Sequence, residues 1–386
     1  MKTEKMNTGL FDKITMIIPT MNRYLFLSRL FRFYESYAYP MQIIVMDTSD
    51  RYDGFEVVEK YFNIRQIKYR KVKSEELYMA KIKYALDEIE TPYVVICADD
   101  DFIIPETVEK CISYLEENRS YSVAHGIYYS HYIEENENRV LEFKNNLLYY
   151  TTKSIDQDSP FERIKSLYNE YRGSSFYGVH RTEHMRKMWK EVVDNTSDPY
   201  FGELIPQGLS IIFGKLKVFN EPYMFREVIP ISKNTLREGD AYIPVRDRAD
   251  YAQRLDKASC CLARYLAQYD NVDIEVANDF FRKYLERSIA GGRRKSNKRS
   301  YLPAMIIDKC LPDPLARKLK TINFKYFDKK GRERKNKREA AMDMIINDGK
   351  YHHIYKQIES IVVSARVNVI TSKKTENSLW NKPSRP

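Results

Sequence analysis

The residues best suited to chemistry are three consecutive carboxylates, Asp99, Asp100 and Asp101, here called the acid triplet. They directly follow the short apolar run YVVICA and precede the sequence FIIP. Three adjacent carboxylates repel one another, so their position at the end of an apolar strand calls for a compensating cation. Carboxylate oxygens suit Mg²⁺ or Mn²⁺, and these ions in turn bind phosphate oxygens. The alternative is a polar turn that caps the following helix.

The chain before the acid triplet alternates strand and helix patterns. Short, β-branched runs predict strands, and apolar residues at helical spacing predict the helices between them. The predicted strands are residues 14–18, 42–47, 66–72 and 93–98, and the predicted helices are residues 23–36, 55–61 and 77–88. This order predicts an α/β fold with a doubly wound, mostly parallel, Rossmann-like sheet. Ligands of such sheets bind at the carboxyl ends of the strands, so the loops after Ile18, Asp47 and Ala98 should hold the site.

The pattern after the acid triplet is mixed and then becomes helical. It predicts helices at 105–118, 161–168 and 200–213 and one that Thr182 caps, with strands at 121–133, 139–143, 175–180, 215–219 and 223–227. Beyond residue 240 only helices are predicted, at 251–268 and 272–289. We therefore expect a catalytic domain at 1–235, a helical, basic domain at 236–370 and a disordered tail at 371–386.

Three runs carry a resemblance to a known family: KITMIIPTMNR, QIIVMDTSD and LYMAKIKYALDEIETPYVVICADDDFIIP. Together they resemble the nucleotide-binding half of GT-A glycosyltransferases, particularly the inverting family 2 type, over roughly residues 12–230. The resemblance implies a nucleotide-sugar donor, a DxD-type site for Mg²⁺ or Mn²⁺, and an inverting displacement. It implies a glycan or lipid-linked acceptor, as in the synthesis of bacterial surface polysaccharides.

The resemblance also implies roles for individual residues. Asp99 and Asp101 match the outer carboxylates of the DxD motif, with Asp99 nearer the ribose and Asp101 the metal ligand. The triplet departs from the family pattern, because many relatives read DADD or DSDD, so the division of labour among its three acids stays open. The donor-binding set implied in this way is Pro19, Thr20, Arg23, Asp47, Ser49, Lys81, Asp99 and Asp100.

An inverting transfer needs a base that takes the proton from the attacking hydroxyl. Glu203 matches best the carboxylate that opens a helix in the family's ED-like motif, and Asp198 is the alternative. Glu203 could instead merely stabilise the positive end of its helix, worth ~0.3–1 kcal/mol.

The leaving diphosphate gains negative charge, which a cation and basic side chains can offset. Arg23, Arg181 and Arg226 are candidates, since each follows a predicted strand, although each could be an ordinary ion-pair partner.

Several other motifs are excluded. The string HRTEH at 180–184 fits an inverted zinc-peptidase motif, but His180 ends a predicted strand and so does not share a helical face with His184. His352 and His353 are adjacent and have no ligand at metal spacing nearby. The chain has neither a P-loop nor a GxGxxG turn, which removes the main support for nucleotide-binding folds of those types.

Composition indicates a folded protein of more than one domain. The chain has 386 residues, 43% of them hydrophobic and 13% aromatic, which is unlike a disordered protein. Its five cysteines show no CxxC spacing, so neither a disulfide framework nor a zinc site is indicated.

No apolar run approaches the ~20 residues of a membrane helix, and no signal peptide is evident. We expect a cytoplasmic protein.

The positive charge is concentrated in one segment. Residues 281–340 contain 20 Lys and Arg against 6 Asp and Glu, whereas the remaining chain has 44 against 48. Basic clusters beside apolar patches can bind an anionic membrane surface, at ~1 kcal/mol per charge, here the inner face of the cytoplasmic membrane. An anionic polysaccharide, a partner protein and a solvated helical face are alternatives. Nucleic acid is disfavoured, because no recognised RNA- or DNA-binding motif accompanies the charge.

The sequence therefore predicts a metal-dependent glycosyltransferase. Two other classes remain open: a non-catalytic nucleotide- or glycan-binding protein with the same fold, and a nucleic-acid-binding protein that acts through residues 281–340.

Overall fold

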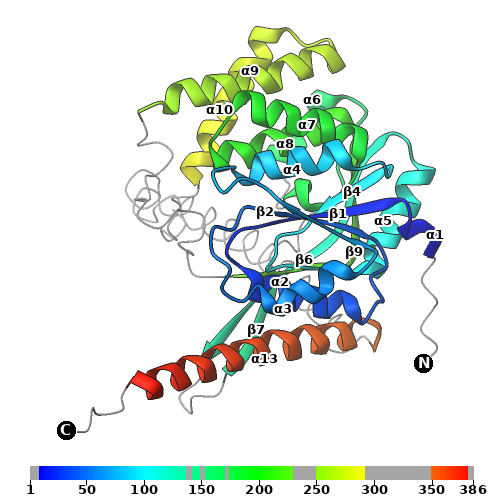
Figure 1. Cartoon of the computed structure of the whole chain (residues 1–386). Helices are drawn as coiled ribbons and strands as arrows, with labels where there is room; N and C mark the ends of the chain where they lie inside the picture. Colours follow the sequence, from blue (N-terminus) through cyan, green and yellow to red (C-terminus); the bar gives the residue numbers. More distant parts are fainter. Residues whose placement is uncertain are drawn as a thin grey trace, which may run out of the picture.

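A nine-stranded mixed sheet forms the centre of the molecule, with helices on both faces (Figure 1). The computed structural model describes residues 8–135, 141–147, 153–169, 174–228, 249–291 and 349–380. The strand order is β3-β2-β1-β4-β8-β6-β9-β5, and β7 pairs with β6 outside this path.

The first half of the sheet is parallel, as predicted. It contains β1 (Ile14–Thr20), β2 (Gln42–Asp47), β3 (Ile67–Lys71) and β4 (Tyr93–Ile96). The short helix α1 (Thr8–Phe11) precedes them, and the crossovers contain α2 (Tyr24–Glu35), α3 (Glu56–Glu59) with the 3-10 helix η1 (Lys60–Asn63), and α4 (Tyr78–Glu88). Thr20 pairs with Asp47 and Asp47 with Lys71, so the carboxyl ends of three strands lie level at one edge.

The second half of the sheet is mixed. Its strands are β5 (Phe102–Ile103), β6 (Tyr121–Glu135), β7 (Leu141–Leu147), β8 (Val179–Arg181) and β9 (Lys215–Glu227). Strand β8 is antiparallel to β4 and to β6, whereas β9 runs parallel to β6. The helices of this half are α5 (Pro105–Glu117), α6 (Pro160–Asn169), η2 (Ser175–Tyr177), α7 (Thr182–Asn195) and α8 (Pro199–Phe213).

Three predicted details are wrong. The two strands expected at 215–219 and 223–227 form one strand, β9, because register shifts opposite Ile127 accommodate Pro222 within the ladder. The strand expected at 175–180 is mostly the 3-10 turn η2, and only its end joins the sheet. Thr182, the expected N-cap, is the first residue of helix α7, and Arg181 is the N-cap. The Thr182 hydroxyl does not cap the helix, because it donates to the Thr91 carbonyl at 2.7 Å.

Two hydrophobic cores lie on opposite faces of the sheet. Met16 and Ile18 of β1 contribute to one core, with α2, α3 and α5, whereas Ile17 contributes to the other, with α4, α7 and α8. This alternation follows from the two-residue period of a strand whose two faces are both covered by helices. Figure 1 shows the two helical layers on either side of β1 and β2.

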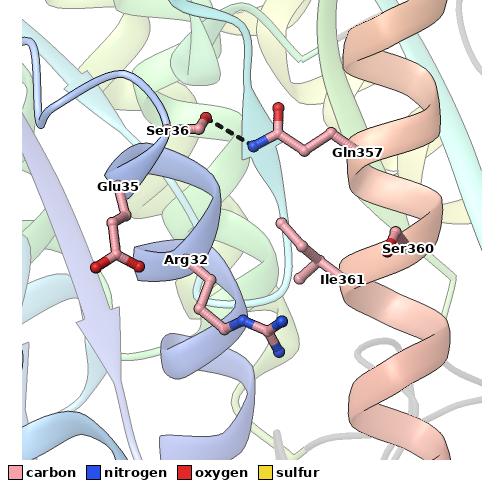
Figure 2. Close-up of a pocket in the computed structure, with 6 residues that line it drawn as sticks. All are labelled: Arg32, Glu35, Ser36, Gln357, Ser360 and Ile361. Atoms are coloured by element: carbon pink, nitrogen blue, oxygen red, sulfur yellow. Dashed lines mark hydrogen bonds between the residues drawn. The ribbon is translucent and has the colours of Figure 1, made fainter.

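The C-terminal helices extend these same cores. Helices α9 (Tyr251–Asp270) and α10 (Ile274–Gly291) pack on the α7 and α8 side, where Leu262 lies so close to Gly208 that a Cβ there would be 2.7 Å from it. Helix α13 (Gly349–Trp380) packs on α2 on the other face (Figure 1). Figure 2 shows Gln357 donating to Ser36 at 2.6 Å beside a hollow of about 430 Å³ between these two helices.

The remaining predictions about the C-terminal part have mixed outcomes. The expected boundary near residue 236 and residues 292–340 of the basic segment lie outside the described residues. Helix α13 continues through Trp380, so residues 371–380 of the expected disordered tail are helical. Once a helix is nucleated, each added residue gains a hydrogen bond, which favours this extension. Among the described helices, none is both long and apolar enough to cross a membrane.

Replacing Ile358 tests the packing of α13 on the sheet domain. Its side chain is fully buried in the core that α2 shares. We expect Ile358→Ala to lower the free energy of unfolding by about 2–5 kcal/mol, because a cavity remains in that core. Urea denaturation measures the change, and Lys356→Ala, an exposed change on the same helix, is the control. Equal stability of the two variants would contradict this packing.

Replacing His131 tests the acid sensitivity of the fold. Its ring is buried, stacks on Phe143 at 5.1 Å, and its nitrogens have no hydrogen-bond partner among the described residues. Burial and the nearby charge of Arg29 lower the pKa of His131 from 6.5 to about 3. A lowered folded-state pKa means that this contribution to stability is complete above pH 6.5 and is lost as the pH falls toward 3.

We expect the free energy of unfolding of His131→Phe to fall less steeply with decreasing pH, by up to ~1.4 kcal/mol per pH unit. The reason is that the variant lacks an imidazole that takes up a proton when the protein unfolds. Urea unfolding between pH 6 and pH 4 measures the slope. His353→Gln, an exposed change on α13, is the control. An unchanged slope in His131→Phe would show that His131 does not titrate in this way.

Candidate active site at the carboxyl ends of the strands

A cavity of about 290 Å³ opens at the carboxyl ends of the parallel strands. Its lining combines charged and polar residues with aromatic and apolar ones. The charged and polar residues include Thr20, Arg23, Thr48, Lys81, Asp99 and Glu203, and the aromatic and apolar residues include Pro19, Leu77, Tyr78, Phe176, Tyr177 and Pro199. The structure thus brings six of the predicted site residues to one cavity, from segments up to 184 residues apart in the sequence.

The acid triplet lies in the turn between β4 and β5. The Asp101 amide donates to the Ala98 carbonyl at 3.1 Å, which closes the turn, and β5 then pairs with β9. This geometry separates Asp101 from Asp99 and Asp100, which share Arg23 as a partner. Asp99 accepts from the Thr20 hydroxyl at 2.7 Å and lines the cavity, whereas Asp101 faces the end of β9.

Two arginines compensate the three carboxylates. Arg23 lies 3.2 Å from Asp99 and donates to Asp100 at 2.5 Å. Arg226 donates through Nε to Asp101 at 3.2 Å. Burial raises the pKa of Asp99 to about 6 and that of Asp101 to about 7, and Arg23 and Arg226 respectively oppose these shifts. Three acids and two arginines leave one formal negative charge, which the nearby Lys81 partly offsets at Asp99.

Arg23 is held by the loop that joins β1 to α2. Asn22, just before it, has a φ of 56°, a left-handed conformation that asparagine tolerates. The Asn22 amide side chain donates to Asp50 at 2.7 Å, which ties this loop to the loop after β2. The guanidinium of Arg23 lies 4.2 Å from the ring centre of Phe26. Arg181 is different: it donates to the carbonyls of Tyr121 and Leu115, away from the cavity.

Asp47 is the centre of a second polar cluster beside the cavity. Its buried carboxylate accepts from the hydroxyls of Tyr24 at 2.8 Å and Tyr69 at 2.7 Å, and from the Ser49 amide at 2.7 Å. Lys71 lies 3.4 Å away. Burial would raise the pKa of Asp47, but the hydrogen bonds from Ser49, Tyr69 and Tyr24 together lower it. Asp47 is therefore a buried anion held by several donors.

Lys81 joins the two polar clusters. It comes from the buried face of α4, and its ammonium donates to the Thr20 carbonyl at 2.8 Å and to the Thr48 hydroxyl at 3.0 Å. Burial lowers the pKa of Lys81 to about 8, although Asp99 and Asp47 oppose the shift. A buried cation thus lies between the loops that follow β1 and β2.

The two candidate bases lie differently on α8. Asp198 is the buried N-cap of the helix and accepts from the Tyr200 amide at 2.8 Å, and it is not among the described residues that line the cavity. Glu203 does line the cavity. It reaches solvent through the cavity opening, yet the surrounding protein raises the pKa of Glu203, with Arg226 opposing the shift. Glu203 is therefore placed to accept a proton from a molecule in the cavity.

The histidine motif at 180–184 forms part of the hydrophobic interior. The ring of His180 is buried and shares a 2.8 Å hydrogen bond with the Ser175 carbonyl. His184 packs beside Phe213, with their ring centres 5.3 Å apart. These contacts support a structural role for both residues.

The acid triplet fits a divalent cation that is completed by another molecule. Among the described residues, no group of three or more His, Cys, Asp or Glu side chains is arranged to hold a metal ion by itself. Mg²⁺ is commonly bound through one or two carboxylates together with substrate phosphates. The uncompensated negative charge and the hard oxygen ligands of the triplet suit such a shared site. Asp101 and Asp99 are the residues that would contribute.

Residues 15–173 match the family described as Glycosyl transferase family 2. This match supports a nucleotide-sugar glycosyltransferase with the GT-A fold. Its span includes β1 to β4, the acid triplet and β6, while β9 and Glu203 follow it in the chain. No curated protein sequence matches the chain.

Solved structures of S. aureus TarS are similar to this chain. The TarS structure aligns with a TM-score of 0.48 and 15% identity over 72% of this chain, but over only 44% of the TarS chain. The structure of TarS 1–349 in complex with UDP-GlcNAc aligns with a TM-score of 0.49 and 15% identity, over 72% of this chain and 73% of that one.

Sequence reasoning missed several residues of the GT-A site. Tyr24, Tyr69 and Lys71 contact Asp47 but were not candidates. Tyr69 and Lys71 could have been found, because they end the third predicted strand and therefore lie at the carboxyl edge. Tyr177 had no such signal, since the 3-10 turn that carries it was expected to be a strand.

Replacing Asp47 tests whether its cluster holds a buried anion. Asp47→Asn keeps the shape but removes the charge, which leaves the hydroxyls of Tyr24 and Tyr69 with a weaker acceptor. We expect the free energy of unfolding to fall by about 1–3 kcal/mol. Asp87→Asn, an exposed change on α4, should alter it by less than about 0.5 kcal/mol. Urea denaturation at pH 7 compares the variants, and equal stability would show that Asp47 is not a required acceptor.

Proposed function

We propose that this protein transfers a sugar, with inversion, from a nucleotide-sugar donor to a hydroxyl of a glycan or lipid-linked acceptor, in bacterial surface polysaccharide synthesis. The observation that carries the proposal is the single cavity that Thr20, Lys81, Asp99 and Glu203 share. It combines polar groups for a nucleotide with a further carboxylate, Glu203, in the same cavity. The family 2 match supports the reaction class.

The polar residues of the cavity lining suit the nucleotide. Pro19, Thr20 and the buried cation Lys81 line the cavity, where a base can bind, whereas the buried anion Asp47 and Ser49 are not among the described lining residues and support the loop next to it. Asp99 can accept from ribose hydroxyls. These groups are fixed before any ligand arrives, because each is hydrogen-bonded to a neighbouring loop. Such preorganisation reduces the entropy lost on binding.

The diphosphate belongs next to the acid triplet. Arg23 and Arg226 provide positive charge there, and Asp101 and Asp99 would hold Mg²⁺ or Mn²⁺. That ion, when bound, supplies Lewis-acid stabilisation of the leaving diphosphate. Arg23, held by its contacts with Asp99 and Asp100, keeps a fixed positive charge beside the bond that breaks.

Glu203 acts as the base on the acceptor side. The acceptor hydroxyl attacks the anomeric carbon as its proton moves to the Glu203 carboxylate, and the bond from that carbon to the diphosphate oxygen breaks. A carboxylate with a raised pKa holds the transferred proton more readily. The aromatic residues Tyr78, Phe176 and Tyr177 on this side exclude water and offer flat surfaces for a sugar ring.

A donor panel tests the reaction. Purified protein is incubated with nucleotide-sugars of several bases, UDP-GlcNAc among them, with Mn²⁺ or Mg²⁺, and release of the nucleoside diphosphate is measured. We expect hydrolysis or binding of one donor class. If no donor is bound or hydrolysed with either metal, the proposed function is wrong.

Glu203→Gln tests the base. We expect kcat to fall by about 10²–10⁴-fold while the dissociation constant of the donor stays unchanged, because only proton transfer is lost. Steady-state kinetics and calorimetry provide the two values. Glu183→Gln, an exposed change on α7, is the control. If Asp198→Asn abolishes turnover and Glu203→Gln does not, then Asp198 is the base.

A further inference from the structure

Both oxygens of the Asp101 carboxylate face the end of β9. One lies 3.2 Å from Arg226 Nε, and the other accepts from the Glu227 amide at 3.2 Å. The carboxylate is only 2% exposed. The same oxygens would be needed for a cation at Asp101, so a cation must compete with Arg226.

The contact of Arg226 with Asp101 is less extensive than the contacts of Arg23 with its two acids. It contacts Asp101 through a single nitrogen, without the paired geometry that makes arginine–carboxylate contacts strong. Its side chain is 27% exposed, whereas that of Arg23 is 17% exposed and contacts both Asp99 and Asp100. Of the two arginines, Arg226 is therefore the one that a cation can replace at lower cost.

Tyr177 provides a second position for Arg226. The guanidinium lies 4.6 Å from the centre of the Tyr177 ring, and its Nη2 is 3.4 Å from the Tyr177 hydroxyl. Tyr177 lines the cavity, and the charge of Arg226 already acts on Glu203 there. A guanidinium released from Asp101 therefore stays at the border of the cavity, supported by the aromatic ring.

We propose that Arg226 is an exchangeable counter-ion, which a divalent cation displaces from Asp101 and which then binds the diphosphate of the donor. The inference rests on the proposed function, because it assigns Arg226 to the diphosphate part of that site. A cation near Asp101 repels the guanidinium and at the same time attracts the diphosphate. Cation and diphosphate binding are therefore coupled through one side chain.

Binding measurements with Arg226→Gln test this exchange. Mn²⁺ is titrated alone, followed by electron paramagnetic resonance, and the nucleoside diphosphate of the donor class is titrated calorimetrically with and without Mn²⁺. We expect the variant to bind Mn²⁺ about threefold tighter than the wild type, since a competing ion pair is gone. We expect it to bind the diphosphate at least about tenfold more weakly in the presence of Mn²⁺.

Two further variants sharpen the test. Arg226→Lys keeps the positive charge but not the planar guanidinium group. It should therefore still compete with Mn²⁺ and bind the diphosphate more tightly than Arg226→Gln but more weakly than the wild type. Arg282→Gln makes the same chemical change on the exposed face of α10 and should match the wild type in both titrations.

The outcomes separate this inference from the proposed function. If the wild type binds the diphosphate with Mn²⁺ and Arg226→Gln has unchanged affinities for both, the exchange is wrong and the proposed function stands. If Arg226→Gln binds Mn²⁺ more weakly, Arg226 supports the cation site, and the exchange is equally wrong. If the wild type binds no nucleoside diphosphate with either metal, both are wrong.

Discussion

The repulsion among Asp99, Asp100 and Asp101 is the constraint on which the site depends. Burial makes the charges of Asp99 and Asp101 more costly, and the turn between β4 and β5 directs Asp101 to Arg226 while Asp99 and Asp100 share Arg23. Arg23 is supplied by the loop after β1, and Arg226 by the end of β9. The site is therefore stable only when the loop after β1 and the end of β9 each contribute one arginine side chain. The remaining negative charge favours binding of a divalent cation.

Because the site depends on contacts between distant segments, the sequence predicted the strands and the location of the site better than its individual contacts. Strands β1 to β4 were predicted within one or two residues at most ends, because short buried runs of a parallel sheet carry a strong local signal. The location of the site followed from the same pattern, since the carboxyl ends of parallel strands meet at one edge. Thr20 and Asp99, at the carboxyl ends of β1 and β4, consequently line one cavity, whereas Lys81, from α4, was a candidate only through the family resemblance.

The rest depends on contacts between segments far apart in the chain. Arg226 was one of three arginine candidates, of which only Arg23 was also in the donor-binding set, and only the pairing of β5 with β9 separates it from Arg181, which binds backbone carbonyls elsewhere. Tyr24 and Tyr69 look like ordinary core residues in the sequence. Their hydroxyls meet at Asp47 because α2 and β3 flank β2, an arrangement that no local pattern specifies.

The two helical layers explain why the site can combine fixed and exchangeable charges. Lys81 comes from α4, and Arg23 is the N-cap of α2, a helix that packs on the opposite face of the sheet; each is anchored to loops of the parallel half. Arg226 instead comes from the mixed half, at the end of a strand whose register shifts against β6. The parallel half thus holds Lys81 and Arg23 through two polar contacts each, while Arg226 of the mixed half contacts Asp101 through one nitrogen and also lies over the Tyr177 ring. A charge that must leave one anion for another is best placed where a neighbouring ring supports its second position.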